Sequence, residues 1–269
     1  MGVSSVAALD GTQLQVRTVG SGPGVVLLHG GGVTSEDYRR LITGLAPHCT
    51  VHAFDRRGYG NGIPIPPDDA VLATNLADIR AVVEATGATG LFGHSGGAFY
   101  ALQAALEIPV GRVAVYDPPL AIDGLMPIDW LEPFGAAIEA GDSVTAMVAM
   151  GSSMNEVRLP LSVQRAVTRL FVKTPIGRKL ATMLPATLPD VRAIAAAAGP
   201  ASAYAGITAR VLLACGAKGP SYYGPICDRL ADAIPHGTSI RIPKASHNAA
   251  NIARPSFVAP FAEFFADAS

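Results

Sequence analysis

The chain is poor in charge, in cysteine and in aromatic residues. Charged residues make up 15% of its 269 residues, aromatic residues 6%, and the formal net charge is −1. Without a basic block, nothing favours binding to nucleic acid or to an anionic membrane surface. The scarcity of charge does not indicate disorder, because 49% of the residues are hydrophobic and a chain of this length can bury a sizeable core. We expect a globular monomer or homodimer whose partner is a small-molecule substrate.

The three cysteines, Cys49, Cys215 and Cys227, are too widely spaced for a disulfide framework or a metal-binding pattern. We expect buried or half-buried free thiols, in keeping with a reducing compartment. No apolar run is long enough to span a bilayer, and residues 1–10 lack the charged start and apolar stretch of a secretion signal. These absences predict a cytoplasmic protein that contacts no membrane.

What the chain does contain is an alternation of short apolar strands and amphipathic helices. A hairpin opens it, and continuous apolar strands follow, as in a buried parallel sheet. We expect strands at residues 3–8, 12–18, 25–28, 50–54, 88–92, 112–116, 210–214 and 239–242. We expect helices at residues 34–45, 71–86, 98–107, 225–234 and 256–266. This order predicts an α/β fold with a mostly parallel eight-stranded sheet and helices on both faces.

The alternation stops after the sixth strand. Residues 118–205 are helical in pattern, are interrupted by prolines and contain the only tryptophan, Trp130. We interpret this stretch as a helical cap inserted between two parts of the core, residues 1–117 and 206–269. Ligands of open α/β sheets bind beyond the carboxyl ends of the strands, so the cap should cover that edge.

The motif Gly93-His94-Ser95-Gly96-Gly97 lies between the strand at 88–92 and the helix at 98–107. Strand, sharp turn and helix with a serine at the tip are typical of a nucleophile elbow. The flanking glycines let strand and helix approach closely, and the helix start provides backbone N–H groups that can hold a negative charge. The motif therefore favours Ser95 as a nucleophile and Gly96 as an oxyanion donor.

A serine nucleophile needs a base, and the base needs an acid. His247 is the best base candidate, because it follows the last strand. The loop after the strand at 210–214 contains no carboxylate, so we favour Asp117, at the end of the strand at 112–116, as the acid. Asp55 is the third candidate for the acid. It also follows a strand, but the simpler interpretation is that it stabilises the Arg-Gly turn that it begins. Four other histidines are interpreted as surface or core side chains: His29, His48, His52 and His236.

The second oxyanion donor is expected from His29-Gly30-Gly31-Gly32, which follows a strand. We favour the N–H of Gly31, with Gly32 as the alternative. The glycine spacing does not fit a phosphate-binding loop or a dinucleotide-binding motif. Neither a metal nor an organic cofactor is needed by such a site.

Together, these features resemble the α/β-hydrolase superfamily, in particular its capped, single-domain bacterial branch. The resemblance covers nearly the whole chain outside the cap. It rests on the ordered motifs His29-Gly30-Gly31-Gly32, Asp55-Arg56-Arg57-Gly58-Tyr59-Gly60, Gly93-His94-Ser95-Gly96-Gly97, Tyr116-Asp117-Pro118-Pro119 and Ser246-His247. Members of that branch commonly carry a carboxylate before Pro-Pro after the sixth strand, so the resemblance supports Asp117. A serine nucleophile argues against the epoxide hydrolases and haloalkane dehalogenases of the family, which use a carboxylate.

The first hypothesis is a serine hydrolase acting on an ester, thioester or lactone. We expect substrate contacts from Gly32, His94, Trp130, Met147 and Met150. An apolar pocket is also suggested by Met154, Phe171, Met183 and Leu184, although ordinary helix core is the simpler interpretation of most such residues. Two alternatives stay open: a lyase or cyclase on the same fold, and a ligand-binding protein without turnover.

Overall fold

Eight strands form one sheet in the computed structural model, which describes residues 2–60, 62–154 and 159–266, without the side chains of 153 and 154. The strands are β1 (Gly2–Ala7), β2 (Gln13–Gly20), β3 (Gly24–Leu28), β4 (Thr50–Phe54), β5 (Gly90–His94), β6 (Arg112–Tyr116), β7 (Arg210–Gly216) and β8 (Gly237–Ile242). Their order is β1-β2-β4-β3-β5-β6-β7-β8. The first two pairings, β1 with β2 and β2 with β4, are antiparallel, and the others are parallel. The predicted mostly parallel eight-stranded sheet is confirmed.

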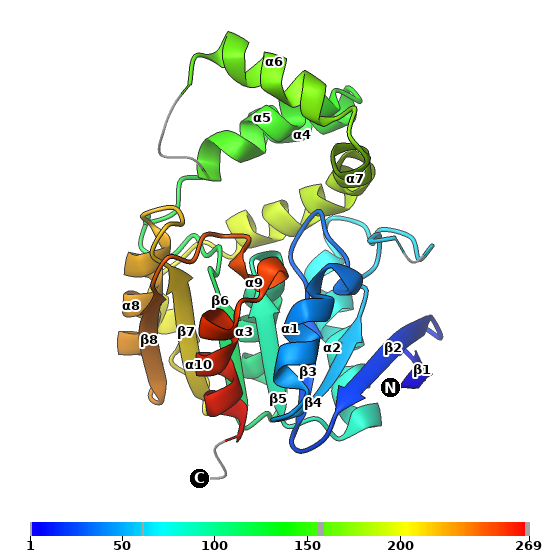
Figure 1. The fold of residues 1–269 in the computed structure, drawn as a ribbon, viewed down its shortest axis with the longest axis vertical. Coiled ribbons are helices and arrows are strands. Elements are labelled where there is room, and N and C mark those ends of the chain that lie inside the picture. The colour runs from blue at the N-terminus through cyan, green and yellow to red at the C-terminus, as the bar shows by residue number, and fades with distance from the viewer. Residues whose placement is uncertain (1, 61, 155–158, 267–269) are drawn as a thin grey trace.

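Helices cover both faces of the sheet (Figure 1). One face carries α1 (Arg39–Leu45) and α10 (Pro255–Ala266), and the other carries α2 (Val71–Thr86), α3 (Gly96–Glu107) and α8 (Tyr223–Ala233). Strand β3 explains why the central strands are continuously apolar. Val25 and Leu27 pack towards α1 and α10, whereas Val26 and Leu28 pack towards α2 and α3. Both sides of the strand are buried, so no position favours a polar residue.

Several element boundaries differ from the sequence-based expectation, most of them by one or two residues, and two of these differences lie close to the site. The helix expected at residues 34–45 begins as a 3-10 turn, η1 (Ser35–Tyr38), before α1 continues it. Thr34 caps this turn, because Asp37 accepts hydrogen bonds from the backbone and side chain of Thr34. Strand β5 begins and ends two residues later than expected and reaches His94, so the turn at Ser95 is sharper than the pattern indicated.

The cap helices are α4 (Leu131–Glu139), α5 (Ser143–Met154), α6 (Leu161–Phe171) and α7 (Pro175–Ala196). They lie beyond the carboxyl ends of the parallel strands (Figure 1), and we keep the name cap for residues 118–205. A small apolar core that includes Phe134, Met147 and Leu184 holds α4, α5 and α7 together. Helix α7 also contacts α2 and α3, so it connects the cap to the sheet layers.

The three cysteines are buried free thiols, as expected. Within the described part of the chain, none of the helices has the length and apolar character needed to cross a membrane. The remaining short elements are η2 (Ala201–Tyr204) and α9 (Ala249–Ile252). Helix α9 directly follows the loop that carries His247, so it helps to position that loop.

Candidate active site

Ser95 lies at the turn between β5 and α3, in a backbone conformation that serine rarely adopts. Its φ is +51° and its ψ is −128°. Such strain persists only where the surrounding structure imposes it, and it is frequent at active sites. The start of α3 approaches the neighbouring strand β3 so closely that a Cβ added at Gly97 would lie 2.2 Å from the carbonyl oxygen of Leu28, which explains the glycine at position 97. The turn leaves Ser95 on the wall of a cavity.

Asp117 lies fully buried at the end of β6, and its carboxylate accepts two hydrogen bonds. One oxygen, Oδ2, lies 2.9 Å from Nδ1 of His247, and Oδ1 accepts the backbone N–H of Gly216 at 2.9 Å. An ionised carboxylate requires the imidazole proton on Nδ1, which leaves Nε2 as an acceptor. The contact predicted between Asp117 and His247 is present. The loop after β7 lacks an acid, and Gly216, the last residue of β7, donates its N–H to Asp117.

The ring of His247 is held between two aromatic rings. Tyr223 stacks on it with centroids 5.6 Å apart and an interplanar angle of 6°, and His94 lies 4.7 Å away on centroids. His94 is itself buried and receives a hydrogen bond on Nδ1 from Tyr38, at 2.5 Å. Tyr38 Oη in turn accepts the N–H of Gly30. His94 therefore packs against the ring of His247. Through Tyr38 it also connects the turn at Ser95 to Gly30 of the glycine loop after β3.

His29 fixes the conformation of the glycine loop after β3, which we define as His29-Gly30-Gly31-Gly32. Nε2 of this buried ring accepts the N–H of Arg56 at 2.9 Å, so Nδ1 carries the proton and donates to the carbonyl of Gly30 at 2.7 Å. The N–H of Gly31 lies 3.6 Å from where a Cβ on Gly96 would stand, so the two predicted oxyanion donors border one space. A Cβ on Gly31 would meet Thr187 of α7 at 2.9 Å, so the close approach of the cap requires glycine there.

Both buried histidines should make the protein sensitive to acid. Burial, followed by the charge of Arg56, lowers the pKa of His29 to about 4, and burial, followed by His247, lowers the pKa of His94 well below its ordinary value. The unfolded chain then binds more protons than the native protein, so stability falls as the pH drops below about 6.5. For His29 alone, the expected loss in free energy of unfolding between pH 6.5 and pH 5 is about 2 kcal/mol.

Urea unfolding at pH 7 and pH 5 measures this loss, and ring-proton NMR identifies its source. We expect the His29 and His94 signals, assigned with His29→Gln and His94→Gln variants, to show neutral rings at pH 5. Titration of either ring near pH 6.5 would contradict the account.

A buried ion pair connects the cap to the same loop. The guanidinium of Arg56 donates to both carboxylate oxygens of Asp190 in α7, at 2.9 and 2.8 Å, and its Nε donates to the carbonyl of His29. The hydroxyls of Tyr59 and Tyr100 also donate to the Asp190 carboxylate, at 2.6 and 2.7 Å. Burial opposes the charge of Arg56, but Asp190 and Tyr59 raise its pKa above the ordinary value. Both oxygens of the Asp190 carboxylate are hydrogen-bonded, so the pair holds α7 against the glycine loop after β3.

Asp190→Asn should destabilise the protein by about 3–5 kcal/mol, because it leaves the Arg56 charge buried without a counter-ion. Asp68→Asn is the matched control. Asp68 also pairs with a cap arginine, Arg192, but both side chains are at least 40% exposed, so we expect a loss below about 1 kcal/mol. Urea denaturation of both variants measures the difference. Equal losses would mean that the buried pair has no special role.

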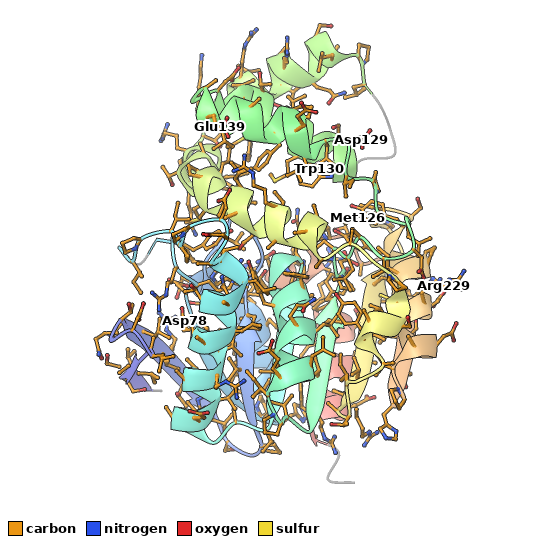
Figure 2. The ribbon with its side chains drawn as sticks, turned by 180° about the vertical axis from the view of Figure 1, so that it is seen from behind. Asp78, Met126, Asp129, Trp130, Glu139 and Arg229 are labelled. Atoms are coloured by element: carbon orange, nitrogen blue, oxygen red, sulfur yellow. The ribbon has the colours of Figure 1, made fainter. Side chains whose placement is uncertain are left out.

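A cavity of about 470 Å³ lies between the cap and the carboxyl edge of the sheet. The core contributes Gly31, Ser95, Gly96 and His247 to its wall. The cap contributes mainly apolar side chains, among them Met126, Trp130, Met150, Phe171, Leu180 and Val191. Figure 2 labels Met126 and Trp130 where the chain passes from the core into the cap. The polar residues of the wall include Asp37, Lys179, Asn248 and Asn251.

The structure brings most of the predicted residues to this cavity. Gly32, Trp130 and Met150 line it, together with Gly31, Ser95, Gly96 and His247. Asp117 is fully buried and is not among the lining residues. His94 and Met147 do not belong to the described lining: His94 lies beneath His247, and Met147 packs in the cap core. These two positions do not favour the substrate contacts that we expected.

The weaker apolar candidates are divided in the same way. Phe171 lines the cavity, Leu184 packs in the cap core, and Met183 packs against Tyr59. The side chain of Met154 lies outside the described residues. Two of the three described side chains, Met183 and Leu184, are therefore ordinary core.

Asp55 accepts the N–H of Ser35 and so fixes the start of η1, whereas His247 is hydrogen-bonded to Asp117. Sequence reasoning did not single out Asp190 or its partner Arg56. One signal was available, because Asp190 is the one charged residue in the sequence segment 180–191. Among the described residues, no three His, Cys, Asp or Glu side chains gather in the manner of a metal site.

The curated relatives match only part of the chain. A pimeloyl-[acyl-carrier protein] methyl ester esterase from Pseudoalteromonas atlantica is 43% identical over 72 residues, which cover 27% of this chain and 28% of that protein. The enzyme of the same name from Xanthomonas campestris is 32% identical over 99 residues, which cover 37% of this chain and 38% of that protein. The chain thus spans between a quarter and two fifths of the length of these relatives.

Solved structures match over the whole length. An alpha/beta hydrolase from Sphaerobacter thermophilus has a TM-score of 0.81 and 28% identity, covering 97% of this chain and 100% of that one. The enol-lactonase from Burkholderia xenovorans has a TM-score of 0.74 at 19% identity, covering 98% and 100%, and at that identity it shows the fold alone. The model of the alpha/beta hydrolase family matches residues 25–261. The chain therefore belongs to the alpha/beta hydrolase family.

Proposed function

We propose that this protein hydrolyses an ester, thioester or lactone of a small, largely apolar molecule, with Ser95 as the nucleophile. The observation that carries the proposal is the Asp117–His247 hydrogen bond, formed beside a strained serine on the wall of one cavity. A hydroxyl is inert at neutral pH unless a base of this kind activates it. The partial similarity to methyl ester esterases supports ester chemistry.

In the proposed reaction, Ser95 Oγ attacks the acyl carbonyl carbon and His247 Nε2 takes the hydroxyl proton. Asp117 keeps the imidazole in the required tautomer and stabilises the imidazolium. The N–H groups of Gly31 and Gly96 hold the oxyanion that forms on the carbonyl oxygen. His247 then protonates the leaving alcohol or thiol, and a water molecule releases the acid from the acyl-enzyme by the same steps.

The cavity supports a substrate with an apolar body. Its volume of about 470 Å³ is within the usual range of small-molecule sites, and its cap wall is mainly apolar. Because the reacting serine stands on the core wall, the acyl or alcohol part of the ester would extend towards the cap. Longer linear acyl chains should therefore be preferred until they fill the space.

The test is hydrolysis of p-nitrophenyl esters of increasing acyl length, by wild type and by Ser95→Ala. We expect turnover by wild type only, with kcat/KM rising with chain length and then falling. A folded wild-type protein that hydrolyses none of these esters would contradict the proposal and favour a lyase, a cyclase or a ligand-binding protein. Ligand screening would then replace the ester assays.

A further inference from the structure

Helix α6 exposes its apolar side chains to solvent. Val163, Val167 and Leu170 are 42%, 58% and 68% exposed, and none of the residues of this helix is buried. At 3.6 residues per turn these three side chains share one side of the helix. The half-buried residues are the polar Gln164 and Thr168. The helix thus has the reverse of the usual arrangement, in which the apolar side faces the protein.

The position of α6 makes this side accessible. The helix packs mainly on α5 and lies at the far end of the cap from the sheet (Figure 1). Its apolar surface continues into the cavity, because Phe171 and Ile176 line the cavity and Ile176 is 72% exposed. An apolar molecule on this surface would therefore be next to the wall of the cavity that contains the proposed active site.

The sequence of α6 and of the first part of α7 carries charge of one sign. Residues 159–189 contain five basic residues and no acidic residue. Lys179 pairs with Asp37. Across the described residues, Arg165, Arg169 and Lys173 have no carboxylate within 4.0 Å, and all three are exposed. A second copy of this surface would repel it, whereas an anionic surface would attract it.

We propose that α6 docks the protein on an anionic lipid–water interface. An amphipathic helix with aliphatic and aromatic side chains on one side and arginines on the other lies in such an interface, with its apolar side among the acyl chains. We define the docking surface as the apolar residues Val163, Val167, Leu170, Phe171 and Ile176 with the basic residues Arg165, Arg169 and Lys173. The further step, that an apolar substrate enters the cavity from the lipid, rests on the proposed function.

This proposal departs from the expectation of no membrane contact. That expectation used the net charge of the whole chain, −1, which hides the local charge of the cap. The basic residues of 159–189 are offset by acidic residues elsewhere in the sequence. Electrostatic attraction to lipid acts over about a Debye length, roughly 10 Å at 0.1 M salt, so the local charge decides it.

The test is flotation of the full-length protein with phosphatidylcholine vesicles that contain or lack phosphatidylglycerol, at low and high salt. We expect binding to the anionic vesicles that weakens with salt. Val167→Ser/Leu170→Ser and Arg165→Glu/Arg169→Glu should each weaken partitioning by about tenfold or more. These positions are exposed, so both variants should fold, and hydrolysis of a dissolved short-chain ester should be unchanged because neither pair lines the cavity.

Two controls match these changes on the core. Leu9→Ser removes an apolar side chain that is 93% exposed, in the turn of the first hairpin. Arg80→Glu/Arg229→Glu makes the same change in net charge on α2 and α8, and Arg229 is labelled on the core in Figure 2. Both controls should partition like the wild type.

The proposal is overturned if the wild type does not float with anionic vesicles, or floats equally with neutral ones. It is also overturned if the controls weaken binding as much as the α6 variants, or if ultracentrifugation shows a dimer that Val167→Ser/Leu170→Ser dissociates. Flotation needs no turnover, so its failure is distinct from a failure of the proposed hydrolysis.

Discussion

Ser95→Ala is expected to lower kcat for p-nitrophenyl ester hydrolysis by on the order of 10⁴- to 10⁶-fold. The variant keeps the base and the oxyanion donors but has no oxygen to form the acyl-enzyme, so only their residual effect remains. The substitution removes one oxygen from a half-buried side chain, so the fold and the free energy of unfolding should change little. Steady-state kinetics and circular dichroism measure the two effects separately.

Ser152→Ala is the matched control. Ser152 is an exposed serine on α5 whose hydroxyl donates to the carbonyl of Ala149, and it is not among the residues that line the cavity. Its activity should equal that of the wild type. If Ser95→Ala retained more than about a tenth of the activity, the nucleophile would have to be another group.

Asp117→Asn should lower kcat by about 10³- to 10⁴-fold at neutral pH. An amide group facing Nδ1 of His247 can donate to it, which stabilises the tautomer with its proton on Nε2. That tautomer cannot accept the proton of Ser95. Because Asp117 Oδ1 also accepts the N–H of Gly216, the loss should appear in kcat, with a smaller effect on KM. Michaelis–Menten kinetics of the variant measure the two constants.

Asp123→Asn controls for the change in charge and for the backbone. Asp123 also has a left-handed backbone, with φ +49° against +47° for Asp117, and asparagine tolerates that conformation. Asp123 is exposed and does not line the cavity, so this variant should keep full activity. Near-wild-type activity of Asp117→Asn would mean that another group orients His247.

The sheet was predictable because strands that are buried on both faces have continuously apolar sequences. The expected ranges 50–54 and 112–116 coincide with β4 and β6. Prediction was poorer at β5, because the elbow extends the strand into the glycine motif as far as His94. Local pattern cannot show that shift, since the pairing of His94 with Tyr116 sets the end of the strand.

The proposed site was largely predictable for a topological reason. The carboxyl ends of neighbouring parallel strands meet at one edge, so residues that follow β5, β6 and β8 had to converge. Ser95, Asp117 and His247 follow these three strands. The loop after β7 was informative as well, because it contains no carboxylate. We therefore expected the acid at the end of β6, where Asp117 contacts His247.

The sequence predicted a helical cap but not how the cap packs on the core. Arg56 and Asp190 are 134 residues apart, and no local pattern indicates that their side chains meet. The amphipathic sequence of α6 predicts a helix but not which of its sides faces the protein. Both features depend on how the cap packs, and that packing is set by long-range contacts.

The most direct test of the proposed chemistry is to find the acyl group on the protein. Wild type is mixed with a p-nitrophenyl ester, quenched in acid within a single turnover and digested, and its peptides are measured by mass spectrometry. The account predicts a mass increase of one acyl group on the peptide that contains Ser95, formed as nitrophenol is released, and no such peptide from Ser95→Ala. Release of nitrophenol with the acyl group on another residue, or with none on the protein, would contradict it.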